Sequence, residues 1–90
     1  MFYTYIILSL KTGRYYVGSA SNLERRVDQH NRGKTTSTRT GIPWKLAYSE
    51  EFDSRKKAVE RERYIKSQKS KIFIEHLISN ASAGHVGQLV

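Results

Sequence analysis

The hydrophobic residues near the start of the chain follow a pattern typical of two β-strands. Residues 2–10 are mostly aromatic or β-branched and contain no glycine or proline, which predicts a strand. Residues 11–13 then supply a short turn with a glycine at its end. The segment 15–17 is again apolar, and it ends at Gly18. Together these segments predict a β-hairpin.

Three later segments have the pattern of α-helices. Ser21 and Glu24 fit a capping box, in which each side chain satisfies a free backbone N–H, and they predict a helix over about 22–31. A second helix is predicted over about 54–68, and a third over about 70–80.

The remaining segments complete a single α+β domain. Residues 33–41 are polar and rich in hydroxyl groups, which predicts a loop, and a third strand is predicted over 44–48. The order is therefore β-β-α-β-α-α, with a small three-stranded antiparallel sheet flanked by helices. We assign this domain to residues 1–80 and expect residues 81–90 to form a flexible C-terminal tail.

Size and composition exclude several classes of protein. A chain of 90 residues has room for one domain, which favours an open site over a deeply buried one. The absence of cysteine excludes disulfides, thiolate catalysis and cysteine-ligated metals. Because no run approaches the roughly 20 apolar residues that span a bilayer, we expect no membrane association and a cytoplasmic location.

The charge balance points to a polyanionic partner. Lysine and arginine number 16 against 8 acidic residues, which gives a net charge of +8. Such an excess on a small domain is typical of nucleic-acid binding, although a basic but non-specific surface is the alternative. Part of the charge is expected to lie on a solvated helix face. The candidate phosphate contacts are Arg32, Lys34, Arg39, Lys66 and Lys69.

In the first predicted helix, charged residues lie on the face that should be buried. Leu23 and Val27 define the inward stripe, and Arg26 and His30 lie along or beside it. An inward arginine requires an anion, which is either a carboxylate or a bound phosphate. The alternative is an arginine that extends its guanidinium to solvent from the edge of the core.

The second predicted helix places a carboxylate on its apolar face. Ala58, Val59 and Ile65 define that face, and Glu62 lies among them. One interpretation is an internal salt bridge, for example with Arg26. The other is a metal ligand, since a single carboxylate can hold Mg²⁺ whose remaining positions go to water and phosphate.

Two tyrosines of the predicted hairpin are candidates for the same site. Tyr5 and Tyr16 come from its two strands and can share one face, although tyrosines in strands most often serve packing. Gly18 can allow a close approach of backbone or ligand at the end of the second strand.

Four motifs resemble, in order, those of the GIY-YIG nuclease superfamily. They are Tyr3-Thr4-Tyr5, Tyr16-Val17-Gly18, the helical segment 22–33, and the segment 52–66 with its A-x-x-x-E-x-x-x-K pattern. The resemblance covers residues 2–78 and is greatest to small stand-alone bacterial members related to the excision-repair incision nuclease domain. Ser19 departs from that domain, which has a lysine at this position.

The resemblance implies an enzyme that hydrolyses phosphodiester bonds in DNA with a single Mg²⁺ or Mn²⁺. It implies that Tyr16 is the general base or activates the nucleophile, with Tyr5 and His30 assisting through hydrogen bonds. It further implies that Arg26 stabilises charge on the phosphate and that Glu62 holds the metal.

The substrate and the activity leave alternatives open. Such a nuclease is expected to be directed by substrate structure rather than sequence and to act in DNA repair or processing, with RNA as an alternative substrate. The second hypothesis is a nucleic-acid-binding module whose site is catalytically weak or inactive. The third is a subunit whose protein partner supplies specificity.

Overall fold

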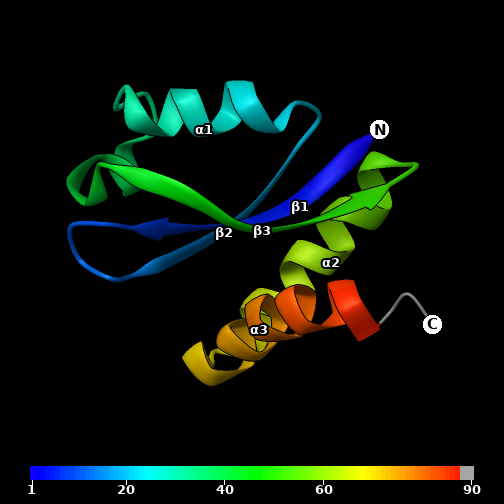
Figure 1. Ribbon diagram of the computed structural model, residues 1–90. Helices are drawn as coiled ribbons and strands as arrows, with labels where there is room; N and C mark the ends of the chain where they lie inside the picture. Colours follow the sequence, from blue (N-terminus) through cyan, green and yellow to red (C-terminus); the bar gives the residue numbers. More distant parts are fainter. Residues whose placement is uncertain (88–90) are drawn as a thin grey trace.

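The computed structural model describes the backbone of residues 1–87 and the side chains of residues 1–81. Its elements follow the predicted β-β-α-β-α-α order, with a short 3₁₀ helix added, and the α+β fold is confirmed (Figure 1). They are β1 (Phe2–Ser9), β2 (Tyr15–Ala20), α1 (Leu23–Asn31), η1 (Thr36–Gly41), β3 (Trp44–Phe52), α2 (Arg55–Ser67) and α3 (Lys71–Gly87).

The three strands form an antiparallel sheet with β1 in the centre, in the order β2-β1-β3. In the hairpin, Tyr5 lies opposite Gly18 and Ile7 lies opposite Tyr16. Opposed residues of an antiparallel pair point to the same face, as do residues two apart along one strand. This register therefore brings Tyr5 and Tyr16 to one face of the sheet.

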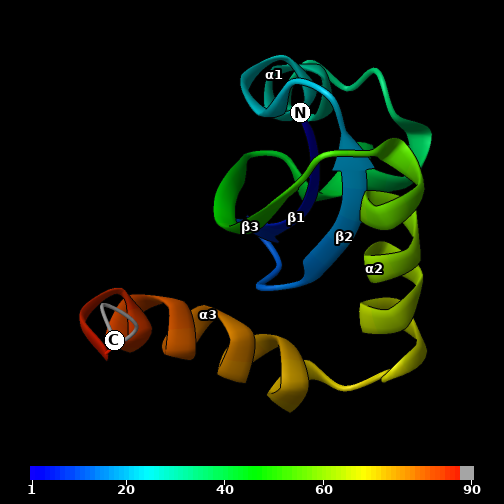
Figure 2. The ribbon, with the colours of Figure 1, turned by 90° about the vertical axis from the view of Figure 1, so that its right-hand side faces the viewer.

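Helices cover both faces of this sheet and create two small cores. Tyr5, Ile7 and Trp44 belong to the core on the α1 side, whereas Ile6 and Ile65 belong to the core on the side of α2 and α3. Figure 2 shows α1 above the sheet, α2 beside β2, and α3 below. Because α2 packs along the edge strand β2, its residues can reach the rim of the α1-covered face.

A buried hydrogen bond attaches α2 to the central strand. The hydroxyl of Thr4, which is fully buried, donates to the carbonyl oxygen of Ala58 at 2.7 Å. Ala58 and Ile65 face the sheet and are both 1% exposed. Glu62 lies between them along the helix, so its position relative to the sheet is well defined.

The start of α1 and the predicted loop differ from expectation. Asn22, rather than Ser21, caps α1: its side chain accepts the N–H of Arg25 at 3.0 Å. Asparagine caps helices as well as serine does, and the helix begins one residue too late for the predicted capping box. The predicted loop contains η1, which a Thr38 N–H to Thr35 carbonyl bond helps to close.

Two elements are longer than predicted. Strand β3 continues to Phe52 because its second half pairs with residues 2–5 of β1. Helix α3 continues to Gly87, so the first seven residues of the predicted tail are helical, which the alanines there favour. Residues 88–90 of that tail lie outside the described residues. Within residues 1–87, no helix combines the length and hydrophobicity needed to cross a membrane.

Candidate active site

Gly18 allows the ring of Tyr5 to lie directly against the backbone of β2. A Cβ atom at Gly18 would stand 2.5 Å from Oη and 2.7 Å from Cζ of Tyr5. Tyr5 itself is only 1% exposed, so it has no room to retreat. Position 18 therefore requires glycine because the Tyr5 ring lies against it, and not because the chain turns there.

The substitution Gly18→Ala is expected to lower stability by about 1–3 kcal/mol, because the added methyl group displaces the Tyr5 ring in a packed core. Urea unfolding monitored by circular dichroism measures this loss. Ser19→Ala, one residue along the same strand, is the control and should change the unfolding midpoint little. An unchanged midpoint for Gly18→Ala would contradict the close packing.

Tyr5 begins a chain of buried hydrogen bonds. Its Oη lies 2.8 Å from Nε2 of His30, and Nδ1 of His30 lies 2.7 Å from Oγ1 of Thr38. The Thr38 hydroxyl donates its proton to the carbonyl of Thr35, so it accepts one from Nδ1 of His30. We therefore assign His30 as the Nδ1–H tautomer, whose Nε2 accepts the phenol proton of Tyr5.

Burial keeps the Tyr5 and His30 rings uncharged. Burial raises the pKa of Tyr5, and the nearby Tyr16 and Glu62 raise it further while Arg26 opposes them. Burial also lowers the pKa of His30, and the charge of Arg26 lowers it further. Tyr5 is thus a fixed proton donor to His30 near pH 7, and it is not a base.

The depressed pKa of His30 is expected to make the fold less stable in acid. The unfolded chain binds a proton near the ordinary pKa of 6.5, whereas folded His30 binds it only at lower pH. The free energy of unfolding should therefore fall as the pH drops below about 6.5. Urea unfolding at pH 7.5 and 5.5 measures the fall, and the variant His76→Gln should retain it. An NMR titration in which His30 protonates above pH 6.5 would contradict this account.

Tyr16 is the member of this group that remains accessible. Its side chain is half-buried, whereas Tyr5 and His30 are buried. The Tyr16 ring contacts His30 edge to face, with centroids 5.1 Å apart, and Trp44 at 6.4 Å. Lys66 of α2 places its Nζ 5.7 Å from the Tyr16 ring centroid. Tyr16 therefore lies on a rigid aromatic support with a positive charge beside it.

Glu62 reaches the same region from α2. Its side chain is 18% exposed, and Oε2 accepts a hydrogen bond from Lys66 Nζ at 2.7 Å. The predicted alternative of a Glu62–Arg26 salt bridge is not formed, because Lys66 lies one turn away on the same helix. Arg26, on α1, is half-buried, and its charge and that of Glu62 both act on Tyr5.

The structure thus brings the five predicted catalytic residues to one region at the β2 edge. Tyr5, Tyr16 and His30 touch directly. Arg26 and Glu62 approach from helices α1 and α2 and influence Tyr5 through their charges. The two inward charges therefore flank the tyrosines instead of neutralising each other.

The predicted phosphate contacts are distributed more widely. Lys66 lies at the site, but Arg32 pairs with Asp28 at 2.9 Å and Arg39 donates to the Gly33 carbonyl at 3.1 Å. Those two arginines therefore also stabilise local structure. Lys34 and Lys69 are exposed.

Three supporting residues were not predicted. Thr38 fixes the His30 tautomer, and its carbonyl accepts the indole N–H of Trp44 at 2.7 Å. Asn31 clamps the backbone of Trp44 through two hydrogen bonds, at 2.6 and 3.0 Å. Thr38 carries no sequence signal, because it lies among several other threonines and serines; Asn31 follows His30 directly in the helix motif.

The donor set near Glu62 is compatible with one hydrated divalent cation. Within the described residues, no group of three or more histidine, cysteine or acidic side chains gathers to enclose a metal. Oε1 of Glu62 has no hydrogen-bond partner among those residues. Mg²⁺ commonly binds through one or two carboxylates and keeps water and phosphate as its other ligands, so Glu62 fits such an ion.

Comparisons with known proteins identify the family. The model of the GIY-YIG catalytic domain matches residues 1–76. A UPF0213 protein of Bacillus licheniformis is 39% identical over 70 residues, which cover 74% of this chain and 72% of that protein. A UPF0213 protein of Streptococcus pneumoniae is 36% identical over 64 residues, which cover 70% of this chain and 65% of that protein.

A solved structure supports the same assignment. The solution NMR structure of a UPF0213 protein from Bacillus halodurans matches with a TM-score of 0.54 and 31% identity, and the match covers 88% of this chain and 84% of that one. The matched family model spans both strand motifs, helix α1 and the whole of α2. The chain therefore belongs to the GIY-YIG catalytic domain family, whose members are generally nucleases.

Proposed function

We propose that this protein is a divalent-metal-dependent endonuclease that hydrolyses phosphodiester bonds in DNA. The observation that carries the proposal is the placement of Tyr16. This accessible tyrosine rests on His30 and Trp44, with Lys66 beside its ring and Glu62 on the same helix as that lysine.

In this mechanism Tyr16, in its phenolate form, accepts one proton from the attacking water. The water oxygen forms a bond to phosphorus, and the bond from phosphorus to the leaving sugar oxygen breaks. That oxygen takes a proton from solvent water, and Tyr16 returns its own proton to solvent. The positive charge of Lys66, 5.7 Å from the centroid of the Tyr16 ring, favours the negatively charged form of that side chain. General-base assistance of this kind typically contributes about 10²–10⁴-fold to a rate.

Arg26 is placed to neutralise the charge that gathers on the phosphate. Its guanidinium is half-buried and close enough to affect both Tyr5 and His30. Arginine binds phosphate oxygens through two parallel N–H bonds, which orients the group as well as stabilising it. Glu62 would hold a divalent cation, which would supply further positive charge to stabilise the transition state.

Tyr5 and His30 are positioning residues in this scheme. Both are buried, and every polar side-chain atom of the two residues takes part in the series of hydrogen bonds that ends at the Thr35 carbonyl. Their contribution is to hold the Tyr16 ring in one orientation through edge contacts. A preoriented base avoids the entropy cost of ordering it during the reaction.

The substrate is proposed from charge and size. A net charge of +8 on 90 residues favours a nucleic-acid backbone. A domain this small has little surface for reading bases, so we propose that DNA structure rather than sequence directs cleavage, in repair or processing within the cytoplasm. RNA remains the alternative substrate.

The test is cleavage of end-labelled plain, nicked, flapped and branched DNA by the full chain with Mg²⁺ or Mn²⁺. We expect cleavage of at least one structured DNA and no cleavage with excess EDTA. Cleavage that persists in EDTA would contradict the metal dependence. Tight, salt-dependent binding of every substrate without cleavage would instead favour a binding module.

A further inference from the structure

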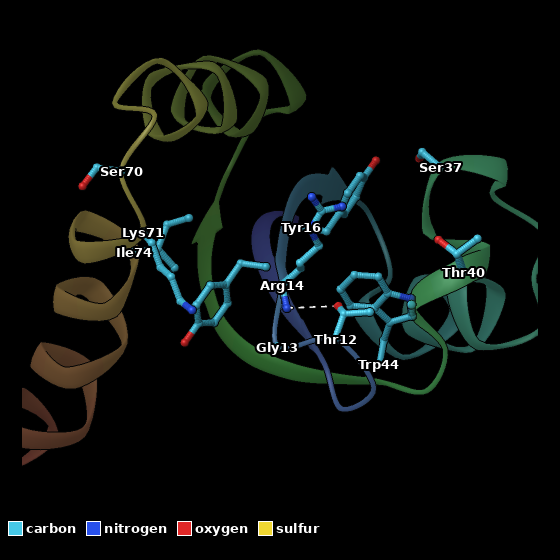
Figure 3. Close-up of a pocket in the computed structure, with 12 residues that line it drawn as sticks. Thr12, Gly13, Arg14, Tyr16, Ser37, Thr40, Trp44, Ser70, Lys71 and Ile74 are labelled. Atoms are coloured by element: carbon cyan, nitrogen blue, oxygen red, sulfur yellow. Dashed lines mark hydrogen bonds between the residues drawn. The ribbon is translucent and has the colours of Figure 1, made fainter.

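Tyr16 also lines a cleft whose lining does not include Glu62. This cleft has a volume of about 510 Å³ and lies where the β1–β2 turn, η1 and the start of α3 meet. Figure 3 shows Lys71 and Ile74 of α3 on one side and Trp44 and Thr40 on the other, with Arg14 and Tyr16 between them. The cleft therefore joins segments that are far apart in the sequence.

The lining of the cleft combines positive charge, hydroxyl groups and aromatic rings. Arg14 and Lys71 supply the charge, and both side chains are exposed. Lys71 Nζ lies 5.9 Å from the ring centroid of Tyr15, and Tyr15, Trp44 and Ile74 supply the apolar part of the lining. None of the twelve described residues that line the cleft is acidic. Sites that bind single-stranded nucleic acid typically combine cations for the phosphate with aromatic rings for the base.

The size of the cleft restricts the form of the nucleic acid. Its volume falls within the range of roughly 300–1,000 Å³ that is typical of small-molecule sites. One unpaired nucleotide fits such a space, whereas a paired base within a duplex cannot turn its face to the wall. Because Tyr16 lines the cleft, a nucleotide bound there is next to the proposed reaction centre.

We propose that this cleft binds an unpaired nucleotide of the strand that is cut, next to the scissile phosphate. The proposal rests on the proposed nuclease function and names its substrate class: DNA with a single-stranded segment at the cleavage site. Arg14 and Lys71 hold the phosphate of that nucleotide, and its base lies against Tyr15. A fully paired duplex leaves the cleft empty and binds more weakly.

The first test is binding in EDTA, so that the DNA stays intact. Fluorescence anisotropy compares a duplex carrying a ten-nucleotide thymidine flap with the same duplex made blunt. The double variant Arg14→Ala, Lys71→Ala is expected to lose about tenfold in affinity for the flapped DNA. Its affinity for blunt DNA should change much less.

The matched control removes two charges from elsewhere. Lys56 and Arg63 are exposed residues of α2 that do not line the cleft. The double variant Lys56→Ala, Arg63→Ala should weaken binding of flapped and blunt DNA by the same factor, because it alters only general charge. The proposal would be overturned if the double variant Arg14→Ala, Lys71→Ala also lost the same factor of affinity for flapped and for blunt DNA.

The second test locates the base directly. A 5-bromouracil at the first unpaired position is cross-linked by ultraviolet light, and the modified peptide is identified by mass spectrometry. We expect cross-links at Tyr15, Tyr16 or Trp44, and cross-links confined to α1 or β3 beyond Trp44 would overturn the proposal. Cleavage without these cross-links would support the nuclease function and contradict nucleotide binding in the cleft. These cross-links without cleavage would support binding in the cleft and contradict the nuclease function.

Discussion

The variant Glu62→Gln is expected to lose cleavage activity by about 10²–10³-fold or more in the presence of Mg²⁺ or Mn²⁺. Glutamine has the size of glutamate and keeps an oxygen that can accept the Lys66 hydrogen bond, which measures 2.7 Å in the structure. It lacks the negative charge that a divalent cation requires. The rate of a single turnover on the best-cleaved structured DNA measures the loss.

The helix itself offers a matched control for this variant. Glu60 is an exposed residue of the same helix, about 160° around the axis from Glu62 given the geometry of an α-helix. Glu60→Gln makes the same chemical change and should leave the rate within about twofold. Equal cleavage by wild type and by Glu62→Gln, with both folded, would reject Glu62 as the metal ligand.

The variant Tyr16→Phe is expected to lower the single-turnover rate by about 10²–10⁴-fold, because it removes the phenol oxygen that accepts a proton. The ring contacts with His30 and Trp44 do not involve that oxygen, so they should persist. The melting temperature should therefore change little. A loss of rate without a loss of stability is the signature of a chemical role.

Two other tyrosines serve as controls for Tyr16→Phe. Tyr3→Phe removes a phenol oxygen from the same sheet outside the site and should leave the rate nearly unchanged. Tyr5→Phe removes the donor to His30 Nε2, so a buried acceptor loses its partner and stability should fall by about 1–3 kcal/mol. A Tyr16→Phe protein that cleaves at the wild-type rate would contradict its assignment as the base.

Local patterns were sufficient to predict the positions of several site residues. The hairpin follows from two apolar strands and a glycine turn, which indicated that Tyr5 and Tyr16 could share one face, as the observed register allows. Helical spacing predicted that Glu62 lies on the face that carries Ala58 and Ile65, and the structure leaves it 18% exposed beside those buried residues. These inferences succeed because periodicity depends only on neighbouring residues.

Partners that lie far apart in the sequence were not predicted in the same way. The helical pattern indicated that Arg26 and Glu62 both face inward, which suggested a salt bridge between them. In the structure Glu62 instead forms an ion pair with Lys66, which is nearer. Thr38 could not be distinguished from its hydroxyl-bearing neighbours until η1 brought it beside His30. Which hydroxyl accepts the hydrogen bond from His30 depends on its distance from that ring in the folded protein, and the composition of the segment does not indicate it.

The amino-acid sequence by itself determined the α+β order, the pairing of the two tyrosine strands, and the basic character of the domain. Only the tertiary structure decided that α1 and α2 approach the β2 edge from different sides, so that Arg26 and Glu62 flank Tyr5 and Tyr16. It also created the cleft that joins Arg14, Trp44 and Lys71. The physical reason is that strand and helix propensities act locally, whereas packing the helices around one sheet sets which distant side chains meet.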